Sequence, residues 1–331
     1  MIDFKHRHAG HCESGTVSAL LRHEGLDLSE PMVFGIGGGL FFLHMPWLRM
    51  GGIPLTSYRD APRAIMKNIG KRLGFQWISQ RYYRPATAQR ELDAHLAAGR
   101  PVGIQTSVYW LPYFPVEMRF HFNGHNLVVY GKQGNDYLVS DPVSEIATVC
   151  PAEDLERARF ARGPFKPRGL VYYPQNVPTA PDLRPSVREA IRATARRMVH
   201  TPVPMLGARG ISWLARKVEH WPETLGEERA RKWVGSVVRM QEEIGTGGAG
   251  FRFMYAAFLQ EAGDLLNNAV LRDSAKDMTA IGDRWRDFAV QGAMLVKQRT
   301  AGGDAYKNLA AILHECGQRE LEIFTRLKTA T

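Results

Sequence analysis

Cysteine is scarce in this sequence. The 331 residues include three cysteines, Cys12, Cys150 and Cys316. An odd and sparse set in a chain of this length argues against a framework of disulfide bonds and is typical of a reducing compartment. The first ten residues are polar and rich in histidine, without the apolar core that a secretory signal needs. We therefore expect a cytoplasmic protein.

Long apolar runs and blocks of basic residues are also missing. The most apolar stretch, residues 32–47, is interrupted by four glycines, His44 and Pro46, and it is too short to span a bilayer. No run of lysine and arginine resembles a nucleic-acid-binding tail, and no motif of such a module occurs. The sequence therefore predicts neither a membrane nor a nucleic acid as partner.

Positive charge is in excess, with 43 Lys and Arg residues against 33 Asp and Glu residues, a formal net charge of +10. Such a balance suits an acidic partner, for example an acidic carrier protein or a group that bears phosphate. The length predicts two domains. Residues 174–185 contain four prolines in twelve positions and read as a linker. The predicted division is therefore 1–176 and 185–331.

The pattern of secondary structure changes at this linker. Before it, we expect helices over 17–24, 57–74 and 86–99 and strands over 101–108, 125–130, 137–141 and 169–173. After it, strand signals vanish and six helices are predicted: 187–200, 210–219, 227–243, 251–267, 271–296 and 303–329. The predicted fold class is an α+β domain followed by an all-α helical domain.

The stretch Gly10-His11-Cys12-Glu13-Ser14 places a thiol beside a histidine at the start of a predicted helix. The first N–H groups of a helix are unpaired and its macrodipole is positive there, which favours a thiolate over a thiol. A nucleophilic cysteine is usually built in this way. The alternative is a small buried residue without chemistry.

A predicted hairpin supplies partners for this thiol. If its turn centres near Gln133, His125 faces Asp141 and Val129 faces Tyr137. Directly opposed residues have Cβ atoms about 5 Å apart, so the imidazole and the carboxylate can hydrogen-bond. In chain order, Cys12, His125 and Asp141 then supply a nucleophile, a proton shuttle and a group that orients the imidazole.

Three further segments attract attention. Residues 35–40 (Gly-Ile-Gly-Gly-Gly-Leu) lack the ending of a phosphate loop and predict a tight turn or close packing of the backbone against the site. Residues 245–250 form a second glycine-rich loop, either a flexible connector or a place of close approach to a ligand or the other domain. The aromatic loop 109–115 is either a wall for an apolar acyl or aryl substrate or part of the core.

These motifs resemble two known groups. The order of Cys12, His125 and Asp141 looks like that of papain-fold cysteine peptidases, especially those that process bacteriocins. The closer resemblance is to the butirosin biosynthesis protein H family. Its features are similar to residues 11–14, 20–25 and 34–40, to Gly124-His125 and Ser140-Asp141-Pro142, and to residues 245–248 with Phe251-Arg252. The resemblance covers most of both predicted domains.

The resemblance implies an acyltransferase with a papain-like N-terminal domain, which moves an acyl group from an acyl carrier protein thioester to an amine. Cys12 would carry the acyl group, His125 would be the base and Asp141 would orient it. No resident cofactor and no metal are implied, because the donor carries its own phosphopantetheine arm. The implied partners are an acyl carrier protein and a small-molecule or peptide amine in antibiotic or other secondary-metabolite biosynthesis; a homodimer stays open.

The oxyanion site departs from the papain pattern, which has glutamine six residues before the nucleophile, where this chain has His6. His6, His8 or His11 would substitute, with the backbone N–H of Cys12 as the other donor. The candidate residues for contacts with the substrate or the oxyanion are His6, His11, Ser14, Gly37, Gly38, Gly247 and Arg252.

Three alternatives stay open from the sequence. A cysteine peptidase or another amide or thioester hydrolase would use the same residues. The spacing of His6, His8, His11 and Cys12 would also suit zinc. A non-enzymatic interaction protein would have a Cys12 that is no more reactive than Cys150 or Cys316, both of which we expect to be structural.

Overall fold

The computed structural model describes residues 2–50, 52–244, 246–299 and 303–331. The chain forms two compact units. The first contains the chain up to Val33 together with Ile65–Asp182, and the second contains Phe34–Ala64 together with Leu183–Thr331. The later boundary lies inside the predicted linker. The segment 34–64 departs from the predicted division, because it packs with the C-terminal helices.

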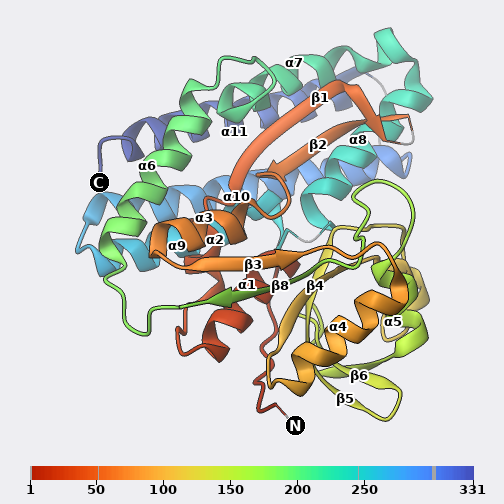
Figure 1. Ribbon diagram of the computed structural model, residues 1–331. Helices are drawn as coiled ribbons and strands as arrows, with labels where there is room; N and C mark the ends of the chain where they lie inside the picture. Colours follow the sequence, from red (N-terminus) through yellow and green to blue (C-terminus); the bar gives the residue numbers. More distant parts are fainter. Residues whose placement is uncertain (1, 51, 245, 300–302) are drawn as a thin grey trace. The chain divides into compact units, whose positions relative to one another are not determined.

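The first unit is built on an antiparallel sheet of six strands in the order β3-β8-β4-β5-β6-β7 (Figure 1). The strands are β3 (Gln76–Gln80), β4 (Val102–Thr106), β5 (His125–Gln133), β6 (Asp136–Ser140), β7 (Thr148–Pro151) and β8 (Val171–Gln175). β4 is buried along its whole length, because it lies between β8 and β5.

Helices cover this sheet. They are α1 (Cys12–His23), α3 (Ala64–Leu73), α4 (Pro85–Ala97) and α5 (Ala152–Arg159), with short 3₁₀ turns η1 (Val108–Trp110) and η2 (Val116–Met118). α1 packs against β4, β5 and β8. Apolar residues of the strands, among them Ile104, Leu127 and Val139, share one buried cluster with Leu92 of α4 and Leu155 of α5. This core fixes the strands that carry His125 and precede Asp141.

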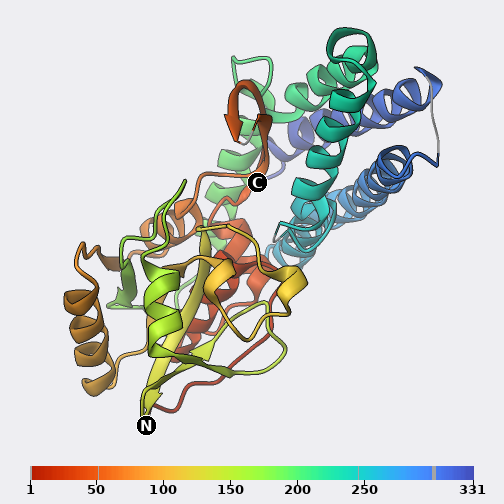
Figure 2. The same cartoon turned by 90° about the vertical axis from the view of Figure 1, so that its right-hand side faces the viewer.

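The second unit consists of one hairpin and a set of helices. The hairpin pairs β1 (Leu40–Met50) with β2 (Ile53–Arg59). The helices are α6 (Arg184–His200), α7 (Gly207–Leu225), α8 (Glu227–Glu242), η3 (Ala249–Phe251), α9 (Arg252–Leu265), α10 (Ala269–Val296) and α11 (Gly303–Leu327). α10 and α11 run side by side, as Figure 2 shows, and α11 also packs along α7. The predicted class, α+β followed by all-α, is confirmed, with the hairpin as an addition. α2 (Glu30–Ile36) begins before the boundary between the two units and ends after it.

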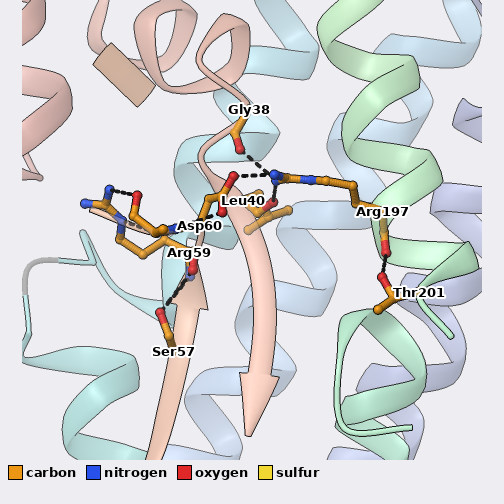
Figure 3. A network of polar contacts seen from close by, with 8 residues as sticks. Gly38, Leu40, Ser57, Arg59, Asp60, Arg197 and Thr201 are labelled. Carbon is orange, nitrogen blue, oxygen red and sulfur yellow. Dashed lines mark hydrogen bonds and ion pairs between the residues drawn. The ribbon is translucent and has the colours of Figure 1, made fainter. Parts of the chain in front are cut away.

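Arg197 of α6 explains why the hairpin belongs to the second unit. Its guanidinium forms an ion pair with Asp60 and donates to the carbonyl oxygens of Gly38, at 2.9 Å, and Leu40, at 3.3 Å (Figure 3). One side chain from the C-terminal part of the chain thus binds the residues at the start of β1 and directly after β2. A sequence pattern does not reveal a contact between residues 137 positions apart.

The structure tests two local predictions. The helix predicted over 57–74 is wrong at its start, because residues up to Arg59 belong to β2 and α3 begins at Ala64. Residues 35–39 pack closely, but against Phe258 of the same unit rather than against the predicted catalytic residues: a Cβ on Gly35 would lie 2.1 Å from the Phe258 ring. The backbone turns at Gly38, which has φ 64°.

Candidate active site

Cys12 is the first residue of α1 and only 7% exposed. His11 is the N-cap, in an extended conformation, and its carbonyl accepts the first hydrogen bond of the helix, from Gly15 N at 2.9 Å. The N–H of a first helical residue has no acceptor within the helix. The thiol and an amide donor therefore come from the same residue, at the positive end of the helix dipole.

His125 and Asp141 lie together in the structure. His125 begins β5, Asp141 directly follows β6, and the distance from Nε2 to Oδ2 is 2.7 Å. The predicted pairing of these side chains is confirmed, but the predicted register is wrong. Val129 pairs with Val139 rather than with Tyr137, a shift of two residues in the partner, because the turn is centred between Gly134 and Asn135 and a bulge interrupts the ladder before Gly131. A shift of two keeps each side chain on the same face of the sheet.

The side chain of Cys12 lies close enough to act electrostatically on the imidazole of His125. Burial alone would lower the pKa of His125. The charge of Asp141 and its hydrogen bond oppose burial, with a smaller contribution from Cys12, and together they raise the pKa to about 10. The ring therefore holds both protons at neutral pH. Cys12, His125 and Asp141 are thus buried neighbours, and a hydrogen bond joins the histidine to the aspartate.

Asp141 is fully buried and accepts two further hydrogen bonds. The hydroxyl of Tyr113 donates to Oδ2 at 2.7 Å, and the amide of Val143 donates to Oδ1 at 3.1 Å. Tyr113 belongs to the aromatic loop, whose next residue, Phe114, packs its ring edge-on against His125 with centroids 5.8 Å apart. Sequence reasoning noticed the loop as a wall or a core element, but it missed the contact with the carboxylate.

His6 does not supply an oxyanion donor. Its Nδ1 lies 2.8 Å from Ser140 Oγ and its Nε2 lies 3.1 Å from the carbonyl oxygen of Ser144. A carbonyl only accepts, so Nε2 carries the proton and donates it there, while Nδ1 accepts from the hydroxyl. Both ring nitrogens are thus used to hold the segment that contains Asp141. The oxyanion prediction for His6 is corrected on this ground.

His11, Ser14 and Glu30 form a second polar cluster beside Cys12. His11 Nδ1 lies 2.9 Å from Ser14 Oγ, which donates to Glu30 Oε1 at 2.8 Å. Glu30 also accepts from the amides of Gly10 and His11. Burial raises the pKa of Glu30, opposed by these hydrogen bonds and by the charge of His8. The cluster orders the turn that leads into Cys12, and no sequence pattern pointed to Glu30.

The remaining predicted contact residues, Gly37, Gly38, Gly247 and Arg252, belong to the second unit. The carbonyl of Gly38 binds Arg197, and Gly247 occupies a left-handed position with φ 63°. Arg252 is fully buried, with two hydrogen bonds of 2.8 and 2.9 Å to the carboxylate of Glu320. The predicted substrate contact of Arg252 is corrected, since its charge is neutralised inside the unit.

The second glycine-rich loop is packed rather than open. Thr246 Oγ1 donates to the carbonyl of Gln241 at 2.6 Å, and the amide of Ala249 donates to Glu242 at 3.0 Å. A Cβ on Gly250 would lie 2.3 Å from the ring of Tyr58. The close approach is therefore to a side chain of the same unit. Gly245, part of this prediction, lies outside the described residues.

The other two cysteines have a different environment. Both are fully buried. Burial, followed by the charges of Asp154 and Asp136, raises the pKa of Cys150 to about 12, and burial also raises the pKa of Cys316. These thiols stay protonated near neutral pH, as structural cysteines do. Within the described ranges, no group of three or more His, Cys, Asp or Glu side chains is placed to hold a metal ion.

A family model described as "Butirosin biosynthesis protein H, N-terminal" matches residues 11–142, and one described as "Domain of unknown function (DUF4872)" matches residues 153–327. The chain belongs to the family of the second model, which covers more than half of it, and the first model confirms the resemblance to the butirosin biosynthesis protein H family that its motifs indicate. Family and fold together indicate a cysteine-type enzyme.

Comparisons with individual proteins add little. A solved structure described as a C39-like peptidase from Bacillus anthracis is 14% identical, with a TM-score of 0.36 over 53% of this chain and 96% of that one. At these values the similarity supports no conclusion about function. No curated protein matches the chain. A search of the described helices finds none with the length and apolar character that crossing a membrane requires.

Proposed function

We propose that this protein is an acyltransferase that accepts an acyl group from a carrier-bound thioester on Cys12 and passes it to an amine. The observation that carries the proposal is the buried pair of His125 and Asp141, 2.7 Å apart, with the Cys12 thiol close enough to act on the imidazole. The family that matches residues 11–142 is named for a biosynthesis protein, which favours transfer over protein breakdown.

The first half-reaction loads the enzyme. The thiolate of Cys12 attacks the thioester carbon, and the amide N–H of Cys12 stabilises the developing oxyanion. The bond from this carbon to the donor sulfur breaks, and His125 gives its proton to the departing thiolate. The products are an acyl-Cys12 thioester and the free thiol of the donor.

The second half-reaction unloads it. An amine attacks the acyl carbon, neutral His125 takes the proton that the nitrogen loses, and the bond to Cys12 sulfur breaks. The amide product leaves and the thiolate–imidazolium pair is restored. Asp141 holds the ring in both steps, because its Oδ2 accepts from Nε2 and so leaves the other ring nitrogen for proton transfer.

We propose one class of donor and one class of acceptor for this reaction. An acidic acyl carrier protein fits the net charge of +10. The acceptor is an amine on a small molecule or a peptide. We place this chemistry in antibiotic or related secondary-metabolite biosynthesis in the cytoplasm, without a resident cofactor or metal.

The amine dependence of turnover tests the proposal. Purified protein is given an acyl-carrier thioester with and without an amine, and release of the carrier thiol is followed. Transfer predicts that the amine accelerates release at least about tenfold and appears in an amide product. Equal rates with free acid as product would identify a hydrolase instead.

A further inference from the structure

The segment between β4 and β5 places two consecutive aromatic residues on the His125–Asp141 pair. The hydroxyl of Tyr113 donates to Asp141 Oδ2, the same oxygen that lies 2.7 Å from His125 Nε2. The ring of Phe114 stands edge-on to the imidazole. One loop therefore contacts both members of the pair, one by a hydrogen bond and the other by packing.

This loop is held in place by Arg119. Its Nε donates to the carbonyl of Phe114 at 2.8 Å, and another nitrogen of the guanidinium donates to the carbonyl of Pro112. These two carbonyls flank Tyr113 on either side. Leu111 and Phe114 anchor the loop in the buried cluster of the first unit. The phenol is thus fixed by its neighbours rather than free to swing away.

We propose that Tyr113 is a positioning residue that limits the negative charge that Asp141 presents to His125, and so sets how readily His125 releases its proton. A carboxylate oxygen that accepts from two donors shares its charge between them. Asp141 is shielded from water, so no solvent replaces the phenol when it is removed. This inference rests on the proposed acyl transfer and names a residue that tunes it.

The titratable groups around the His125–Asp141 pair indicate that the Tyr113 hydroxyl donates to Asp141 at every pH of interest. Asp141 and Cys12 are the titratable groups that act on His125, and Asp141 and Cys150 act on Tyr113. Burial, and then Asp141, raises the pKa of Tyr113 well above its usual value, so the hydroxyl stays a donor over the working range. Its contribution to the His125–Asp141 pair therefore does not change with pH.

The consequence for acyl transfer follows from the proton balance. His125 gives a proton to the leaving thiolate and later must be neutral to accept one from the amine. Without the phenol, Asp141 would bind the imidazolium more strongly, and the neutral form would be rarer at a given pH. We therefore expect removal of the phenol to slow the second half-reaction more than the first.

A titration of His125 tests this inference without depending on turnover. The ring nitrogens of His125 are followed by NMR in the full chain carrying Cys12→Ala, with Tyr113 intact and with Tyr113→Phe. We expect Tyr113→Phe to raise the pKa of His125 by about one unit. A 3-fluorotyrosine at position 113, a stronger donor that keeps the ring, should move it in the opposite direction.

Tyr137→Phe is the matched control. Tyr137 also donates to a carboxylate at 2.7 Å, that of Asp93, in the same unit. It should leave the titration of His125 unchanged. A His125 pKa that moves with neither change at position 113, or that moves equally in Tyr137→Phe, overturns the inference. Failure of Cys12 to take up an acyl group in the unaltered protein would instead refute the proposed function.

Discussion

A buried ion pair dominates the candidate site at the scale of single residues. His125 and Asp141 are 4% and 0% exposed, so their attraction is weakly screened and the imidazole keeps its charge to about pH 10. A histidine that is protonated at neutral pH thus lies beside the thiol and can protonate a leaving group. This state suits the first half-reaction of the proposed acyl transfer.

Asp141→Asn tests the importance of the charge. The amide keeps the size of the side chain but removes the anion that raises the pKa of His125, and it also changes which ring nitrogen is protonated. We expect acylation of Cys12 to slow by about 10³-fold, measured by rapid quench and mass spectrometry. Asp93→Asn, which removes a carboxylate that binds Tyr137 and Lys132, should leave the rate unchanged. Equal rates in Asp141→Asn and the parent would contradict this role.

The sequence allowed part of this site to be predicted. Cys12 was found because helix starts have a recognisable chemistry, and His125 and Asp141 because strand alternation survives a register error of two residues. Tyr113 and Glu30 were missed. Their partners lie 28 and 16 positions away in the sequence. The directions of these side chains depend on the folded loops, so no local sequence pattern predicts the contacts.

At the scale of elements, the second unit is tied together by a buried ion pair between helices. Arg252 at the start of α9 binds Glu320 of α11, and Trp285 of α10 donates to the same carboxylate at 2.8 Å. The guanidinium also lies over the rings of Tyr58 and Trp285, at 5.6 and 5.1 Å. One arginine thus joins three helices to the hairpin.

Arg252→Met should destabilise the protein by about 3–5 kcal/mol, because it leaves the buried Glu320 carboxylate without a counter-charge. The double variant Arg252→Met with Glu320→Leu removes both charges and should recover most of this loss. Urea unfolding measures both. A double variant as unstable as the single one would show that packing, not charge, sets the cost.

The helices of this unit were easier to predict than its hairpin. Amphipathic periods identified the six long helices, with boundaries that differ by a few residues. The hairpin was missed because β1 has no apolar alternation and includes Pro46, and because its anchor, Arg197, lies far along the chain. A long-range contact decided to which unit the segment 34–64 belongs.

For the whole molecule, the raised pKa of His125 makes stability depend on pH. A group whose pKa is higher in the folded state contributes its full stabilisation below the unfolded value of about 6.5, and loses it as the pH rises through the folded value of about 10. We expect the free energy of unfolding to fall between these limits. Urea titrations at pH 6.5 and 10 should show a smaller fall in His125→Gln, and an equal fall would contradict the assignment.

The measurement that tests the central claim most directly is the intact mass of the protein after exposure to an acyl-carrier thioester. We predict a mass increase equal to one acyl group in the unaltered chain, in Cys150→Ala and in Cys316→Ala, and none in Cys12→Ala. Addition of an amine should remove the adduct and yield the amide. An adduct that persists in Cys12→Ala, or no adduct on any form, would contradict the account.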